Sequence, residues 1–353
     1  MTIFSSKSHH LAVTVVAMLI HTWTMCIVPS LFADHPWVVY EGQQGPGQQG
    51  LGKGKHIVFV TGDDEYRSEE AMPMLAKILA MRYGFRCTVL FAIHPDDGTI
   101  TPDYQHNIPG TQLLDDADLM VLFTRFRELP DEQMMPIVNY ANSGKPMIGL
   151  RTATHGFNYG KNKESVYAKY SWNSSDPPGG FGRQVFGDTW INHHGKHGSQ
   201  STRGVTNDSL ASHPVLRGCD DVWGPTDVYG IVHLPKEAEV LLWGQVIDGM
   251  RATDPPVQGA QNDPMMPLAW VREYIGETEK KSRVFCTTMG ASTDFQSAGL
   301  RRLLVNACFW CLEMEEGIPA EVDVEPVGPY QPTFFGFGKY QKGLKPADHA
   351  LPN

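Results

Sequence analysis

Several common sequence signals are absent from this 353-residue chain, and each absence narrows its function. No run of Lys or Arg is long enough to follow a phosphate backbone, and 39 acidic residues outnumber 29 basic ones, giving a formal net charge of -10. We therefore expect no nucleic-acid partner. No segment repeats with a period of roughly 20 to 50 residues, which argues against a solenoid or a propeller.

Cysteine is too scarce to hold the fold together. Apart from Cys26 near the N-terminus, five cysteines are scattered from Cys87 to Cys311, unlike the dense pairs of a disulfide-stapled secreted domain. A large hydrophobic core must supply the stability. The pair Cys308 and Cys311 could be a redox motif. It falls inside an apolar helical pattern and away from a helix start, which favours buried core thiols.

The first 33 residues have the order of an export signal. Lys7 precedes the apolar run 11–20, and the sequence Ser-Leu-Phe-Ala follows at 30–33. The apolar run is too short to span a bilayer comfortably. We predict a signal peptide over 1–33, cleaved near Ala33, with an uncleaved anchor as the alternative. The mature protein is then periplasmic or secreted, without stable membrane insertion.

The remaining chain is predicted to be one α/β domain between a flexible leader and an extended arm. The Gly- and Gln-rich segment 34–54 reads as a flexible leader, the domain covers 55–318, and the Pro- and Gly-rich tail 319–353 reads as an extended arm. Apolar runs predict strands at 56–62, 87–92, 118–124, 145–150, 238–244, 267–274 and 282–290. Helical patterns lie between several of them. This alternation predicts right-handed crossovers and a mostly parallel sheet covered on both faces.

Polar residues gather where the predicted strands end. In an open parallel sheet, ligands bind beyond the carboxyl ends of the strands. The first strand runs into 63–67, which holds Asp63, Asp64, Glu65 and Arg67, and the third runs into Arg125. These charged side chains are therefore expected to lie near one another at one edge of the sheet.

The fourth strand ends at Arg151, at a sharp turn where several α/β enzymes place a nucleophile. Arginine is no nucleophile for acyl transfer. Arg151 could hold an anion or a carbonyl oxygen, with His155 as a proton carrier close by. Alternatively, Arg151 pairs with an acidic residue of 63–65 and only ties loops together. Both interpretations stay open from sequence.

Three histidines, His193, His194 and His197, lie within five residues. Their spacing would suit a metal only on a helix, which Gly195 interrupts, although Asp188 could serve as a further ligand. A proton-transfer or hydroxyl-binding role and a solvated loop are the other interpretations. We name no metal ligand and no cofactor.

The irregular region 151–235 carries further candidates. Trp172 and Trp190 offer flat apolar rings beside polar groups, as a sugar face requires, although each could equally be a buried core residue. Asp227 and Tyr229 lie two residues apart in a predicted turn that could aim both at one pocket. A structural turn is the alternative for Asp227.

Four segments resemble the trehalose-utilisation, or ThuA-like, family: 56–62, 144–157, 213–231 and the strand-helix unit within 267–313. The resemblance implies the flavodoxin-like three-layer sandwich of the class I glutamine amidotransferases, with a mostly parallel central sheet. It also implies carbohydrate metabolism, with trehalose-like or related glycosides as substrates.

Two positions depart from the family pattern. Arg151 stands where amidotransferases carry a catalytic cysteine and ThuA-like proteins often carry histidine, and Gly290-Ala291 stands where the family often has Gly-His. Glutaminase chemistry is therefore excluded. We hypothesise that the cluster of His193, His194 and His197 takes over the role of the missing histidines.

These observations together predict acid/base proton transfer on a sugar or keto-sugar by a lyase, isomerase or hydrolase. We expect His155 and His194 to move protons and Arg151 to stabilise negative charge on oxygen. The residues expected to bind substrate are Glu65, Arg67, Arg125, His193, His197, Asp227 and Tyr229. The alternatives are a non-catalytic carbohydrate-binding protein and a metal hydrolase with histidine ligands. The sequence does not indicate the oligomeric state.

Overall fold

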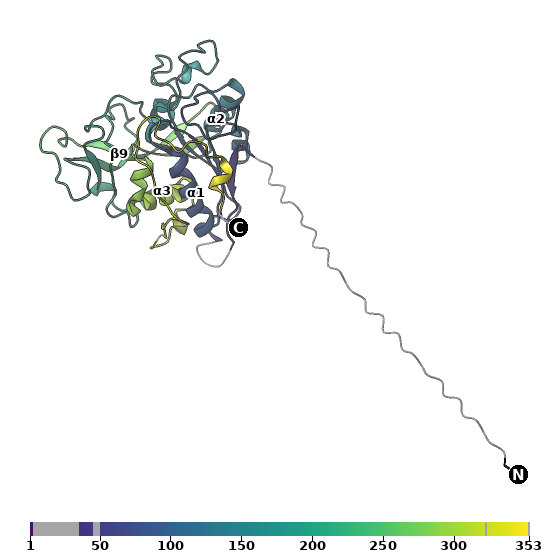
Figure 1. The fold of residues 1–353 in the computed structure, drawn as a ribbon. Helices are drawn as coiled ribbons and strands as arrows, with labels where there is room; N and C mark the ends of the chain where they lie inside the picture. Colours follow the sequence, from purple (N-terminus) through teal and green to yellow (C-terminus); the bar gives the residue numbers. More distant parts are fainter. Residues whose placement is uncertain (3–34, 45–49, 322, 352–353) are drawn as a thin grey trace. The chain divides into compact units, whose positions relative to one another are not determined.

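The computed structural model describes residues 1–2, 35–44, 50–321 and 323–351 (Figure 1). Apart from its first two residues, the predicted signal peptide 1–33 lies outside the described residues, so export stays a prediction. Within the described ranges, none of the helices combines the length and the apolar character needed to cross a membrane.

One mixed sheet forms the centre of the described chain. Its strands, in spatial order, are β1-β3-β2-β4-β5-β10-β9-β8-β6-β7. The strand bounds are β1 (Trp37–Tyr40), β2 (His56–Gly62), β3 (Arg86–Leu90), β4 (Leu119–Thr124), β5 (Met147–Leu150), β6 (Ser201–Thr206), β7 (Trp223–Gly224), β8 (Glu239–Ile247), β9 (Met266–Ile275) and β10 (Lys281–Thr287). The seven predicted strands are therefore all present, with small differences at their ends.

The parallel part of the sheet is β3-β2-β4-β5-β10. Numbered along the chain, these strands have the order 2-1-3-4-5 that flavodoxin-like doubly wound sheets show. The prediction of a mostly parallel sheet is nevertheless wrong. Four neighbouring pairs are parallel, whereas five are antiparallel. The connection 276–280 between β9 and β10 is one reason for the antiparallel pairs. Two parallel neighbours need a crossover connection of about a dozen residues or more, and this connection is too short.

Helices cover both faces of the sheet. The helices α1 (Ser68–Tyr83) and α3 (Ala298–Cys311) pack on one face, and α2 (Asp131–Asn142) packs on the other (Figure 1). Side chains of a strand alternate between the faces. In β2, Phe59 joins the core under α1 and α3, while Val58 joins the core under α2. This double burial is why β2 reads as a continuous apolar run.

The predicted flexible leader and irregular region contain strands that the sequence did not reveal. Trp37–Tyr40 pairs antiparallel with β3 at the sheet edge, so the prediction of a flexible leader over 34–54 does not hold there. Alternate residues of this strand, Val38 and Tyr40, are buried. The strands β6 and β7 are hard to recognise because β6 is rich in Ser, Thr and Gly and β7 has two residues.

The cysteines of the described chain support the core interpretation. Cys308 and Cys311 are both free thiols, buried in α3. Burial raises the pKa of each thiol above its ordinary value, which disfavours the reactive thiolate. The pair has the environment of apolar core residues.

The Asp294 carboxylate holds the backbone segment that follows β10. The carboxylate is fully buried and accepts four hydrogen bonds, two from Thr226 and one each from the backbone of Gly290 and Ala291. We expect Asp294→Ala to lower the free energy of unfolding by at least about 3 kcal/mol, because buried donors lose their partner. Urea denaturation measures the change.

The matched control is Asp115→Ala, at an exposed position. That substitution should change the free energy of unfolding by less than about 0.5 kcal/mol. Equal denaturation midpoints for the two variants would contradict the assigned role of Asp294.

Candidate functional site

The candidate site forms at the carboxyl ends of adjacent parallel strands. Glu65 follows β2, Arg125 follows β4 and Arg151 follows β5. In this strand order, the connections change direction between β2 and β4, and ligand crevices form at such a point. The predicted convergence of charged side chains at one edge is therefore present.

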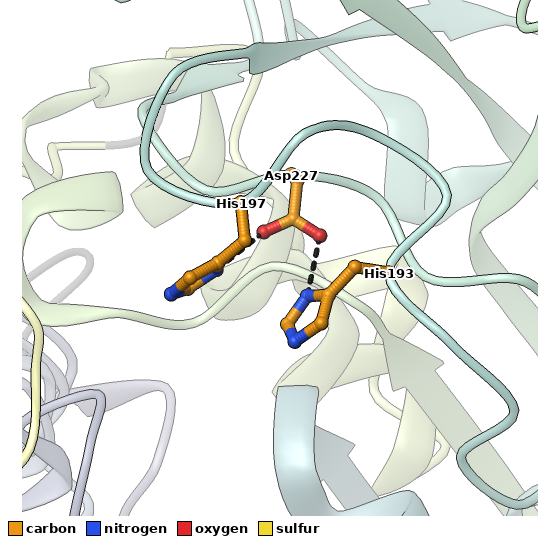
Figure 2. Close-up of side chains that lie close together, drawn as sticks. All are labelled: His193, His197 and Asp227. Atoms are coloured by element: carbon orange, nitrogen blue, oxygen red, sulfur yellow. Dashed lines mark hydrogen bonds and ion pairs between the residues drawn. The ribbon is translucent and has the colours of Figure 1, made fainter.

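Asp227 is the centre of the site (Figure 2). Its side chain is fully buried, and its two oxygens accept hydrogen bonds from different imidazoles. His193 Nδ1 lies 2.7 Å from Oδ2, and His197 Nδ1 lies 2.9 Å from Oδ1. Burial alone would raise the pKa of Asp227, but the bonds from His193 and His197 and the charge of Arg151 lower it below its ordinary value. Asp227 is therefore a carboxylate at neutral pH.

Arg151 lies beside this carboxylate and is 0% exposed. Its Nη2 is 3.3 Å from Asp227 Oδ1, and its Nη1 donates to the carbonyl oxygens of Asp227 and Thr288 at 3.0 and 2.7 Å. The rings of Tyr66 and Tyr229 lie 4.0 and 4.3 Å from the guanidinium. Arg151 thus pairs with Asp227, and not with Asp63, Asp64 or Glu65 as the structural alternative supposed.

His197 lies between two carboxylates. Its Nδ1 donates to Asp227, and its Nε2 lies 3.2 Å from Glu65 Oε1. Hydrogen bonds to Asp227 and Glu65 raise the pKa of His197 to about 9. Burial alone would raise the pKa of Glu65, but the bond from His197 and the charge of Arg125 lower it. His197 is therefore an imidazolium at neutral pH, with 34% of its side chain exposed.

His193 has a different role because, within the described part of the chain, only its Nδ1 has a hydrogen-bond partner. Since Asp227 is ionised, His193 Nδ1 must be the donor, which leaves Nε2 as an acceptor in the neutral ring. A β-bridge between His193 and Tyr229 fixes the loop against the segment that carries Asp227. The side chain of His193 is 31% exposed, so a ligand can reach it.

Two predicted binding residues lie around this centre. Arg125 pairs with Asp64 at 3.0 Å and lies 3.6 Å from Glu65 Oε2, so it supports the carboxylate that holds His197. Arg67 is fully buried and donates to the backbone oxygen of Gly336. Arg67 therefore holds the C-terminal arm, and its burial leaves it no access to a ligand from solvent.

The two histidines predicted to move protons lie apart from Asp227. His155 is buried, with ring centroids of Phe126 and Tyr229 at 5.0 and 5.8 Å, and burial and Arg125 lower its pKa. It is a neutral part of an aromatic wall. His194 Nε2 instead lies 2.8 Å from the backbone oxygen of Gln261. Of these two neighbouring histidines, His193 is therefore the one that contacts Asp227.

Asp188, the proposed additional metal ligand, also lies elsewhere. Its carboxylate accepts from the backbone of Val232 and His233 and lies 3.0 Å from His233 Nδ1. Within the described residues, the group of side chains that could hold a metal ion is His193, His197 and Asp227, with one ligand atom of each within 4.8 Å of the others. Imidazole and carboxylate donors suit zinc, manganese or iron. The Nδ1 atoms of His193 and His197 lie at hydrogen-bond distance from the Asp227 oxygens, 2.7 and 2.9 Å.

Sequence reasoning missed two aromatic residues of the site. Tyr66 covers Arg151, and Phe335 of the arm lies 5.5 Å from the Tyr66 ring and 5.2 Å from the His197 ring. Tyr66 could have been found from its place inside the acidic segment after β2. Phe335 had a weaker signal, the unusual concentration of phenylalanine at 334–337 in a Pro- and Gly-rich tail.

The protonation of His197 can be measured directly by NMR titration of its ring protons. We expect a pKa of about 9 for His197, because two carboxylates stabilise the charged form. Glu65→Gln should lower this pKa, since one of the two carboxylates is removed. Glu237→Gln, at an exposed position, is the control and should leave it unchanged. Titration of wild-type His197 near its ordinary value of about 6.5 would refute the assignment.

Comparison with known proteins identifies the family of this chain. Residues 99–311 match the family described as "ThuA: Trehalose utilisation". No curated protein matches the chain. Two solved structures of ThuA-like proteins are similar, with low identity and low TM-scores. The protein from Bacteroides uniformis ATCC 8492 has 15% identity and a TM-score of 0.43, and covers 77% of this chain and 95% of its own.

The second, from Parabacteroides merdae ATCC 43184, has 16% identity and a TM-score of 0.45, and covers 81% of this chain and 98% of its own. The family match spans more than half of the 353 residues. The chain therefore belongs to the ThuA, or trehalose-utilisation, family.

Proposed function

We propose that this ThuA family protein acts on a sugar or keto-sugar by acid/base proton transfer. The observation that carries the proposal is the sharing of one buried carboxylate, Asp227, by two imidazoles in different roles. Among the described residues, His193 Nε2 has no hydrogen-bond partner, whereas both nitrogens of His197 are engaged by carboxylates. A ring nitrogen that can accept a proton therefore lies beside an imidazolium that can stabilise negative charge, as acid/base chemistry in one site requires.

In this proposal His193 is the general base. The Asp227 carboxylate fixes the Nδ1-H tautomer, orients the ring, and stabilises the imidazolium that forms when Nε2 accepts a proton. The partial exposure of His193 lets a substrate carbon or hydroxyl approach Nε2. Asp227 itself is buried and acts through the two rings.

His197 supplies positive charge. Removing a proton next to a carbonyl places negative charge on the carbonyl oxygen, and a neighbouring imidazolium stabilises that charge. Glu65 keeps His197 protonated. Isomerisation and elimination both begin with such a step, so the same residues serve an isomerase or a lyase.

A carbohydrate substrate is supported by aromatic rings next to these polar groups. The half-buried Trp190 ring lies 5.9 Å from the His193 ring and 5.9 Å from the ring of Trp172. Flat apolar rings beside hydrogen-bonding groups suit the two kinds of surface on a sugar. The family description, trehalose utilisation, agrees with this substrate class.

The mutations that test the proposal are His193→Ala and Asp227→Asn. We expect each to lower kcat by about 100- to 10,000-fold on the disaccharide or keto-sugar that the protein turns over, because the base or its orienting carboxylate is lost. His194→Ala should change kcat by less than about twofold, since this ring bonds to Gln261. Steady-state kinetics on a panel of disaccharides and their keto forms gives these values.

Activity should also fall as the pH rises through about 9. His197 has a raised pKa, so its positive charge is present below that value and lost above it. Glu65→Gln should move this alkaline limb to lower pH. Sugar binding without turnover at any pH would instead identify a non-catalytic carbohydrate-binding protein, and full activity of His193→Ala would overturn the proposal.

A second candidate function is a metal-dependent hydrolase, favoured by the His193, His197 and Asp227 cluster. Those residues would hold the metal, which when bound would activate a water molecule for hydrolysis. Under our main proposal we expect less than about 0.1 metal ion per chain by elemental analysis of the purified protein, since a resident metal would be near stoichiometric. We also expect full activity after dialysis against a chelator. Stoichiometric metal, with activity lost on chelation and restored by zinc or manganese, would favour the hydrolase.

A further inference from the structure

A second binding region lies at the same edge of the sheet as Asp227. An open cavity of about 320 Å³ is formed there by the loops after β4 and β5 and by a segment before β4. Its lining includes Gln105, His106, Phe126, Glu128, Asn158 and Lys161. The volume is sufficient for one hexose ring, and the lining combines one aromatic ring with several hydrogen-bonding groups.

Polar side chains in this cavity are available to a ligand. Neither the Asn158 amide nor Lys161 Nζ forms a hydrogen bond or an ion pair with any residue that the structure describes. Gln105 donates its Nε2 to Asp64 at 3.1 Å, which fixes the amide and presents its oxygen as an acceptor. An amide, an ammonium and a fixed carbonyl oxygen match the donors and acceptors of sugar hydroxyls.

The loop that closes the cavity is held in place. Glu128 is buried, and its Oε1 accepts from the backbone of Lys161 and Asn162 at 2.8 and 2.5 Å. Its backbone oxygen lies 3.0 Å from His106 Nδ1. These bonds position Lys161 on one side of the cavity and His106 on the other, and they do not involve the Asn158 amide.

A strip of half-buried aromatic rings joins the cavity to the histidines. The Phe126 ring lies 5.7 Å from Trp172, Trp172 lies 5.9 Å from Trp190, and Trp190 lies 5.9 Å from His193. Each of these rings is partly exposed. A sugar chain can therefore remain against aromatic surface between the cavity and His193.

A larger cavity at the opposite ends of the strands has no such character. It has a volume of about 460 Å³ and contains Lys55, Asp118, Lys281 and Glu273. These residues pair with one another, Lys55 with Asp118 at 3.1 Å and Lys281 with Glu273 at 2.7 Å. These four charges are paired within the protein, and the cavity lies at the other end of the strands from the Asp227 site.

We propose that the cavity beside Phe126 binds a second sugar unit of the substrate. The sugar that reacts lies at His193, and its glycosidic partner lies on Trp172 and Phe126 with its hydroxyls on Asn158 and Lys161. The protein then selects disaccharides over monosaccharides. This inference rests on the proposed function and specifies its substrate class.

The experiment compares disaccharides with a monosaccharide. The double variant Asn158→Ala/Lys161→Ala removes both free polar groups at partly exposed or exposed positions, where folding should be unaffected. Lys163→Ala, in the same loop but outside the cavity lining, is the matched control. Isothermal titration calorimetry measures Kd for trehalose, maltose, cellobiose and glucose. Thermal unfolding verifies that each variant is folded.

Wild-type protein should bind the best disaccharide at least about tenfold more tightly than glucose, and the double variant should lose about tenfold for that disaccharide alone. Lys163→Ala should bind all probes as wild type does. Wild type without a disaccharide preference, no binding of any probe, or an equal loss for glucose in the double variant would overturn the subsite. The kinetics of His193→Ala on keto-sugars tests the proposed function separately, so either proposal can fail alone.

Discussion

The buried contact between Arg151 and Asp227 is the interaction on which the candidate site depends. Removing two charges from water is costly, and only close pairing with further hydrogen bonds offsets that cost. The chain supplies these bonds, because Arg151 also donates to two backbone oxygens. The rings of Tyr66 and Tyr229 lie 4.0 and 4.3 Å from its guanidinium. Since Arg151 follows β5 and Asp227 belongs to the irregular region, this pair fixes that region on the sheet and orients the two imidazoles.

Backbone strain accompanies this arrangement at three strand ends. Arg67 near the end of β2, Phe126 after β4 and Arg151 after β5 all have left-handed backbones, with φ of 62°, 49° and 42°. Such conformations are unfavourable for bulky side chains and persist where surrounding contacts over-determine them. Each side chain is held: Arg67 by Gly336, Phe126 by the ring of His155, and Arg151 by Asp227. The turn expected at Arg151 from sequence is one of these three positions.

The sequence was sufficient for elements whose apolar pattern is continuous, such as β2 and α1, and for the parallel strands joined by helices. It could not give the reversed direction of β9, which is antiparallel to both β8 and β10, because periodicity reports burial and not the partner strand. The choice between His193 and His194 was also beyond it. In an extended segment, neighbouring side chains point to opposite sides, so a shift of one residue exchanges them. Only the bridge between His193 and Tyr229 fixes that register.

The C-terminal arm also supports the candidate site, although it lies beyond the part of the chain that matches the family, which ends at residue 311. Gly336 receives a hydrogen bond from Arg67 and donates one to the backbone oxygen of Glu65 at 2.8 Å, so the arm clamps the loop that carries Glu65. Phe335 then covers Tyr66 and His197. Because the Glu65 carboxylate helps to keep His197 charged, the protonation state of a histidine in the middle of the sequence depends on a segment near its end.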